Sequence, residues 1–99
     1  LTAAKSLNLN KYKIDKTFLN WNGKSKLLLN KDISLEIINK KNINNLHVYT
    51  PPKENFFCIE PVTNIGDAFQ IKKYSKEYTG LRNLKKNKKF ESSVEFKLL

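Results

Sequence analysis

Apolar and polar residues alternate with a period of two in several short stretches of this chain. The clearest stretch is 33–37, where isoleucine or leucine stands at every second position, the pattern of a half-buried strand. A second stretch, 46–49, alternates in the same way and stops before the proline pair 51–52. Proline ends such a strand because it has no N–H to donate to a neighbouring strand. This periodicity predicts short strands.

The rest of the chain fits the same pattern. We expect further strands at 25–29, 80–84 and 92–98, and an apolar strand within 55–62 that runs into Glu60. Two Asx-rich or glycine-containing segments, 21–23 and 30–32, predict turns. We expect a polar connector at 40–45 and a loop at 66–78. No amphipathic helix or repeat is evident. Five or six short strands at regular spacing indicate an all-β sandwich or barrel fragment.

Length and cysteine content limit what the chain can be. Its 99 residues make one domain at most, with a thin core. The first ten residues carry no signal-peptide pattern. No apolar run reaches the ~20 residues that cross a bilayer. The missing initiator Met suggests a start within a longer gene product. A single cysteine, Cys58, excludes an intrachain disulfide and a cysteine-built zinc site. We therefore expect a cytoplasmic protein without membrane contact, metal or cofactor.

The net charge of +10 raises the question of a nucleic-acid partner. The positive charge is nearly all lysine, and Arg82 is the one arginine. Arginine makes the bidentate contacts to phosphate and guanine, and a protein that reads bases usually carries several. The lysines are also scattered, apart from a cluster at 85–89. We interpret them as a solvated basic surface and keep a basic β-module that binds nucleic acid as the less favoured alternative.

Glu60 is the residue with the strongest chemical signal. It follows four apolar residues, 56–59, and precedes Pro61. A carboxylate at the end of a buried strand has its pKa raised by desolvation, which suits a general base near neutral pH. The competing interpretation is that Glu60 pairs with a lysine at a strand end, and the pattern by itself favours this second interpretation.

Several segments resemble one family. Residues 56–63 read Phe-Phe-Cys-Ile-Glu-Pro-Val-Thr, and 66–69 read Gly-Asp-Ala-Phe. Upstream, 14–25 contain Ile-Asp-Lys-Thr-Phe and then Trp-Asn-Gly-Lys-Ser. In this order and spacing, these segments resemble the signature of the aldose 1-epimerases, or mutarotases, with further similarity at 48–52 and 80–84.

The resemblance implies a fold, an activity and two site residues. It implies that 1–99 form the C-terminal part of a large antiparallel β-sandwich of the galactose mutarotase type. The family interconverts the α and β anomers of an aldohexose of the glucose or galactose kind. By matching position, Glu60 is the catalytic base and Asp15 contacts sugar hydroxyls.

The chain also departs from the family. Its catalytic histidines lie upstream of the segment that contains Asp15, whereas this chain has one histidine, His47, at a place that matches no catalytic position. We interpret His47 as a histidine on a sheet face. The resemblance therefore implies an incomplete site, with the missing histidine on upstream sequence or on an N-terminal half chain. A non-catalytic remnant with weak sugar binding is the alternative, and the sequence leaves open which sugar is used and whether this chain is active by itself.

Overall fold

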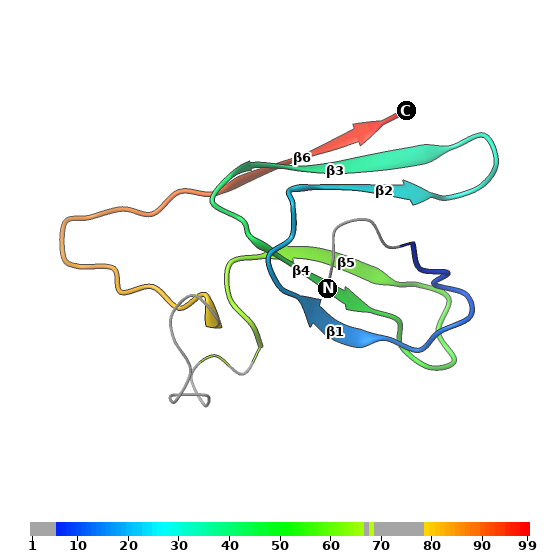
Figure 1. The fold of residues 1–99 in the computed structure, drawn as a ribbon, viewed down its shortest axis with the longest axis horizontal. Helices are drawn as coiled ribbons and strands as arrows, with labels where there is room; N and C mark the ends of the chain where they lie inside the picture. Colours follow the sequence, from blue (N-terminus) through cyan, green and yellow to red (C-terminus); the bar gives the residue numbers. More distant parts are fainter. Residues whose placement is uncertain (1–5, 67, 69–78) are drawn as a thin grey trace.

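Six β-strands make up the regular structure of residues 6–66, 68 and 79–99, the part of the chain that this computed structural model describes. In chain order the strands are β1 (Asp15–Phe18), β2 (Lys24–Leu28), β3 (Ser34–Lys41), β4 (Asn45–Tyr49), β5 (Cys58–Val62) and β6 (Ser93–Leu98). They form two three-stranded sheets with the orders β1-β4-β5 and β2-β3-β6, and every pairing is antiparallel. Figure 1 shows one sheet lying over the other. The prediction of an all-β, sandwich-like architecture is confirmed.

The core lies between the two sheets. Ile37 on β3 is 1% exposed, and Leu46 and Val48 on β4 are also buried. Because side chains alternate between the faces of a strand, burial of Leu46 and Val48 leaves His47 and Tyr49 on the outer face of their sheet. The apolar alternation at 33–37 and 46–49 therefore identified the inner faces of both sheets.

The hairpin between β2 and β3 forms where the sequence predicted it. The side-chain oxygen of Asn30 accepts hydrogen bonds from the backbone N–H groups of Asp32 and Ile33, each at 2.8 Å. The turn at 21–23 is also confirmed, since Gly23 has a φ of 92° and its carbonyl accepts a bond from Asn39 N. The connector after β3 is shorter than predicted, because β3 continues to Lys41 and β4 begins at Asn45.

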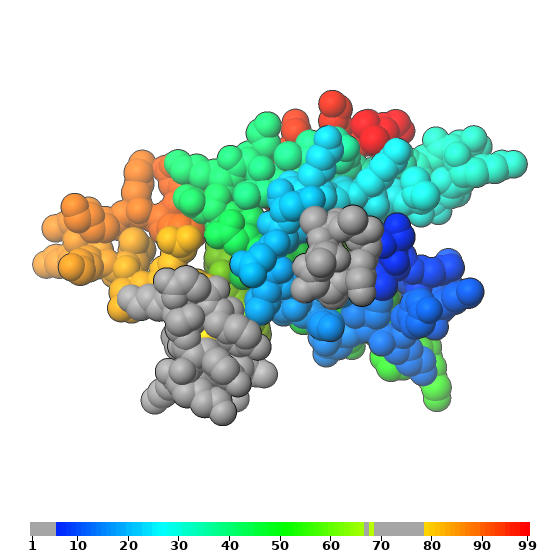
Figure 2. Space-filling view, in the orientation of Figure 1, coloured from blue at the N-terminus to red at the C-terminus, as the bar shows by residue number. Residues whose placement is uncertain are grey.

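The predicted strand at 80–84 is wrong. Gly80 has a φ of 77°, outside the extended region, and lies close to the backbone of Thr63 and Asn64. The carbonyl of the preceding Thr79 accepts a hydrogen bond from Ile65 N. This segment therefore packs against the chain that leaves β5 and joins neither sheet. Figure 2 shows the following residues, in orange, extending away from the sheets.

The last strand, β6, confirms the prediction at 92–98. Most of the predicted loop at 66–78, including the Asp67 and Phe69 positions of the family motif, lies outside the described residues. Within the part of the chain that is described, no helix has the length and apolar character needed to span a membrane.

Candidate functional site

One outer sheet face gathers the polar residues that the sequence singled out. Thr17 on β1, His47 on β4 and Glu60 on β5 are register partners across the sheet β1-β4-β5. The parallel row formed by Asp15, Tyr49 and Cys58 lies two residues along each strand, so it shares the same face. We call this surface the polar face; it consists of Asp15, Thr17, His47, Tyr49, Cys58 and Glu60.

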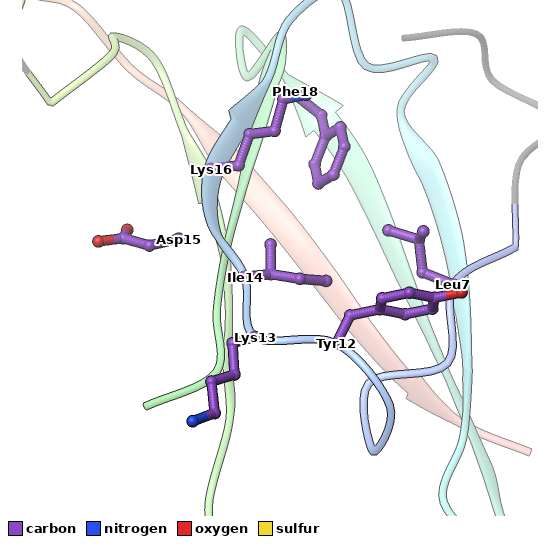
Figure 3. Close-up of a pocket in the computed structure, with 7 residues that line it drawn as sticks. All are labelled: Leu7, Tyr12, Lys13, Ile14, Asp15, Lys16 and Phe18. Atoms are coloured by element: carbon purple, nitrogen blue, oxygen red, sulfur yellow. The ribbon is translucent and has the colours of Figure 1, made fainter. Parts of the chain in front are cut away.

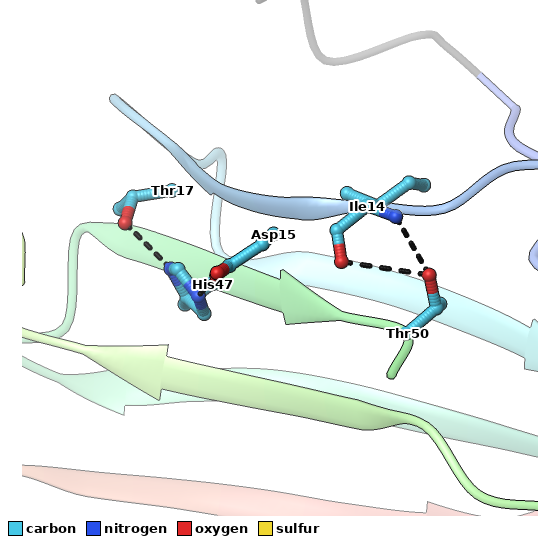
Figure 4. Close-up of polar contacts among 5 residues, drawn as sticks. All are labelled: Ile14, Asp15, Thr17, His47 and Thr50. Carbon is cyan, nitrogen blue, oxygen red and sulfur yellow. Dashed lines mark hydrogen bonds and ion pairs between the residues drawn. The ribbon is translucent and has the colours of Figure 1, made fainter. Parts of the chain in front are cut away.

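His47 lies at the centre of the polar face and contacts both polar residues of β1. Its Nδ1 is 2.7 Å from Oγ1 of Thr17, and its Nε2 is 2.8 Å from Oδ1 of Asp15. Figure 4 shows the imidazole ring between these two side chains. The His47 side chain is 24% exposed and that of Asp15 is 71% exposed, so solvent reaches the carboxylate more freely than the ring.

Backbone contacts hold the start of β1 beside the end of β4. The backbone N–H of Thr50 donates to the carbonyl of Ile14 at 2.7 Å. In return, the N–H of Ile14 donates to the Thr50 hydroxyl at 2.6 Å, and that hydroxyl donates to the carbonyl of Tyr12 at 3.1 Å. These bonds, part of which Figure 4 draws, fix the backbone next to Asp15 and so determine where its carboxylate leaves the strand.

Glu60 lies on the polar face and is exposed, which contradicts the expectation of a buried carboxylate. The strand is shorter than the apolar run: β5 begins at Cys58, and Phe56 and Phe57 before it are exposed at 55% and 41%. Within β5, alternation places Glu60 on the face opposite Ile59 and Pro61. Solvent therefore reaches the Glu60 carboxylate, contrary to the expected burial. The predicted ion pair with a lysine is also absent among the described residues.

A separate cavity lies on the other side of β1 (Figure 3). Its volume is about 440 Å³, and its lining comprises Leu7, Tyr12, Lys13, Ile14, Asp15, Lys16 and Phe18. In Figure 3 the side chains of Leu7, Tyr12 and Ile14 gather on one side of the strand, whereas the Asp15 carboxylate points away from them. The cavity includes neither His47 nor Glu60, and Asp15 is the one residue that its lining shares with the polar face.

The chemistry available on the polar face is hydrogen bonding and proton transfer. Asp15 and Glu60 offer four acceptor oxygens. Hydrogen bonds connect Thr17, His47 and Asp15 in one chain. Across the described residues no cluster of three or more His, Cys, Asp or Glu side chains could hold a metal ion. Cys58 is a free thiol and is half-buried.

The structure brings both predicted site residues, Asp15 and Glu60, onto one surface, and it adds His47. The prediction that His47 lies on a sheet face is confirmed, but its contact with Asp15 was not predicted. That contact depends on the register between β1 and β4, because Asp15 and His47 are 32 positions apart in the sequence. Alternation shows which face a residue takes and says nothing about which residue lies opposite.

Comparison of the chain with protein-family models, curated proteins and solved structures found no match.

Proposed function

We propose that this chain is the C-terminal portion of an aldose 1-epimerase and that its polar face contacts an aldohexose of the glucose or galactose kind. The observation that supports this most directly is the shared face of Asp15 and Glu60. The two residues are far apart in the sequence, on the two edge strands of one sheet, and point to the same side in neighbouring rows. Two exposed carboxylates so placed are suited to accept hydrogen bonds from sugar hydroxyls.

The separation of the two carboxylates is compatible with a single sugar. Two strand spacings and a shift of two residues place their Cα atoms about 10 Å apart across the sheet and about 7 Å apart along it. A hexose ring with its hydroxyls, together with the reach of the Asp and Glu side chains, spans this separation. The sugar then lies over β4, above His47.

Glu60 is the general base of the proposed reaction. It removes the proton of the C1 hydroxyl while an acid protonates the ring oxygen, and the C1–O5 bond breaks. Rotation about C1–C2 and closure on the other face give the second anomer and return both protons. Such a reaction needs two titratable groups on opposite sides of the anomeric carbon. Asp15 accepts hydrogen bonds from other hydroxyls of the sugar and so fixes the orientation in which the sugar binds.

The acid is expected from sequence upstream of this chain or from a separate N-terminal half. The exposure of the inner face of the sheet β2-β3-β6 supports the proposal that further sequence packs there. Phe96 is the register partner of the buried Ile37, yet it is 55% exposed, and Leu98 on the same face is 71% exposed. An apolar inner face that reaches solvent at β6 is a surface on which further strands of a sandwich can pack.

A sugar titration followed by NMR tests the proposal. We expect glucose or galactose, added at millimolar concentration, to shift backbone signals of β1, β4 and β5. Asp15→Asn should weaken this response, whereas Asp32→Asn, in the exposed turn between β2 and β3, should leave it unchanged. Equal responses from both variants, or shifts confined to β2, β3 and β6, would overturn the proposed sugar site.

A further inference from the structure

The two contacts of His47 define which ring nitrogen carries a proton. Oδ1 of Asp15 belongs to a carboxylate, which accepts hydrogen bonds and has none to donate. At 2.8 Å, Nε2 of His47 must therefore be the donor of this pair. In a neutral imidazole Nδ1 is then without a proton, so it accepts the bond from the Thr17 hydroxyl at 2.7 Å. The direction of donation runs from Thr17 through His47 to Asp15.

This arrangement leaves His47 no free N–H for a substrate. Both nitrogens are occupied by β1, so a role as the acid of the sugar reaction would require one of these bonds to break. Asp15, by contrast, has one carboxylate oxygen held by His47, and its side chain is 71% exposed. An exposed aspartate on an edge strand otherwise samples several rotamers. The bond to Nε2 restricts these rotamers and directs the carboxylate toward β4.

We infer that His47 is a positioning residue, which holds the Asp15 carboxylate over the sheet so that its remaining lone pairs meet sugar hydroxyls beside Glu60. This inference rests on the proposed function. The groups that face His47 are Asp15 and Thr17 on β1 and Glu60 on β5, with Tyr49 and Cys58 in the adjacent row. The imidazole ring of His47 lies between Asp15 and Glu60. Because it separates the two carboxylates, they contact the bound sugar from opposite sides.

The ring itself provides a readout that needs no sugar. His47 is the only histidine in the chain, so its ring nitrogen signals are assigned without ambiguity in a long-range ¹H–¹⁵N spectrum. At alkaline pH, where one proton remains on the ring, we expect the form with the proton on Nε2. Asp15→Asn should shift the Nε2 signal, and Thr17→Val should shift mainly Nδ1. A proton on Nδ1, or an Nε2 signal unaffected by Asp15→Asn, would overturn the inference.

Two substitutions of His47 separate positioning from general packing. Glutamine places an amide N–H₂ near the Nε2 position and can still donate to Asp15, whereas the shorter asparagine reaches only the Nδ1 position. We expect His47→Asn to weaken sugar binding about fivefold or more and His47→Gln to retain it within about twofold, since one hydrogen bond to a charged group is lost in the first variant and kept in the second. Circular dichroism melts serve as the folding control.

The outcomes distinguish the inference from the proposed function. In one outcome, the ring signals respond to Asp15→Asn as expected but the wild-type chain binds no sugar. The proposed function is then wrong, and the His47–Asp15 contact is a structural bond without a role in sugar binding. This outcome overturns the positioning inference as well. If sugar binds but His47→Gln and His47→Asn weaken it equally while both remain folded, the sugar site stands and the positioning inference is overturned.

Discussion

His47 on β4 and Glu60 on β5 are register partners, so their side chains lie next to each other on the polar face. Directly opposed residues of an antiparallel pair have Cβ atoms about 5 Å apart. On its other side, His47 contacts Asp15 of β1. Three segments of the chain thus converge on one histidine, and the pairing of β4 with both edge strands is what places Asp15 and Glu60 around the same spot.

The thin core makes Ile37 a sensitive position. Ile37 is 1% exposed on the inner face of β3, whereas Leu98, on the same face of β6, is 71% exposed. We expect Ile37→Ala to lower the free energy of unfolding by about 3 kcal/mol, the usual cost of truncating a buried isoleucine. Leu98→Ala should change it by less than about 1 kcal/mol. Urea unfolding followed by tryptophan fluorescence measures both, and equal losses would show that the inner faces are not packed as described.

Two glycines near the end of β5 differ in their tolerance of alanine. Gly80 has a φ of 77°, and a Cβ there would overlap the Thr63 carbonyl oxygen and come within 2.8 Å of Asn64 Cα. At Gly66, no described residue has an atom within 4 Å of the corresponding position. Because backbone atoms cannot move aside as a side chain does, Gly80→Ala should destabilise the protein by about 2 kcal/mol or more. Gly66→Ala should stay within about 1 kcal/mol, and a similar melting temperature for the two variants would contradict the close approach at Gly80.

Glu91 contributes stability that depends on pH. Hydrogen bonds first from Lys89 and then from Lys41 hold the pKa of its carboxyl below the ordinary value of 4.5. Because this pKa is lowered in the folded state, the contribution is fully present above 4.5 and is lost as the pH falls through the folded pKa. The two ion pairs, at 2.9 and 3.0 Å, are exposed, so added salt should reduce the effect.

The control for Glu91 is Glu95 on β6, which is exposed and has no ion pair among the described residues. Thermal melts across the acid range should show a shallower loss of stability for Glu91→Gln than for the wild type. Glu95→Gln should follow the wild type in this respect. An unchanged acid profile for Glu91→Gln would mean that the pairs with Lys41 and Lys89 do not persist in solution.

The elements predicted from the sequence are those that depend on local pattern. Alternation at 33–37 and 46–49 identified β3 and β4, and the position of Asn30 identified the hairpin turn, because each depends on neighbours within a few residues. The strand expected at 80–84 had the composition of a strand but no partner. Gly80 instead packs against Thr63 and Asn64, a long-range approach that composition does not encode.

The candidate site was predicted only in part, for the same reason. The motif around Glu60 and the segment around Asp15 identified these two residues as site candidates, and the fold places both on the polar face. Burial of Glu60 was predicted wrongly because the four apolar residues before it were assigned to a buried strand, whereas Phe56 and Phe57 precede β5 and face solvent. The contact of His47 with Asp15 depends on register, which is determined by the pairing of distant strands.

The most direct test of the proposed mutarotase site is polarimetry on freshly dissolved α-glucose and α-galactose. The purified chain is compared with Glu60→Gln, with Glu95→Gln as the matched control, and with buffer. We predict a weak acceleration of the drift toward anomeric equilibrium, because a missing acid costs about 10²–10⁴-fold. Glu60→Gln should abolish this acceleration and Glu95→Gln should retain it. A rate equal to that of buffer for the wild-type chain, or an equal acceleration by the wild type and Glu60→Gln, would contradict the claim that Glu60 is the base of a mutarotase site.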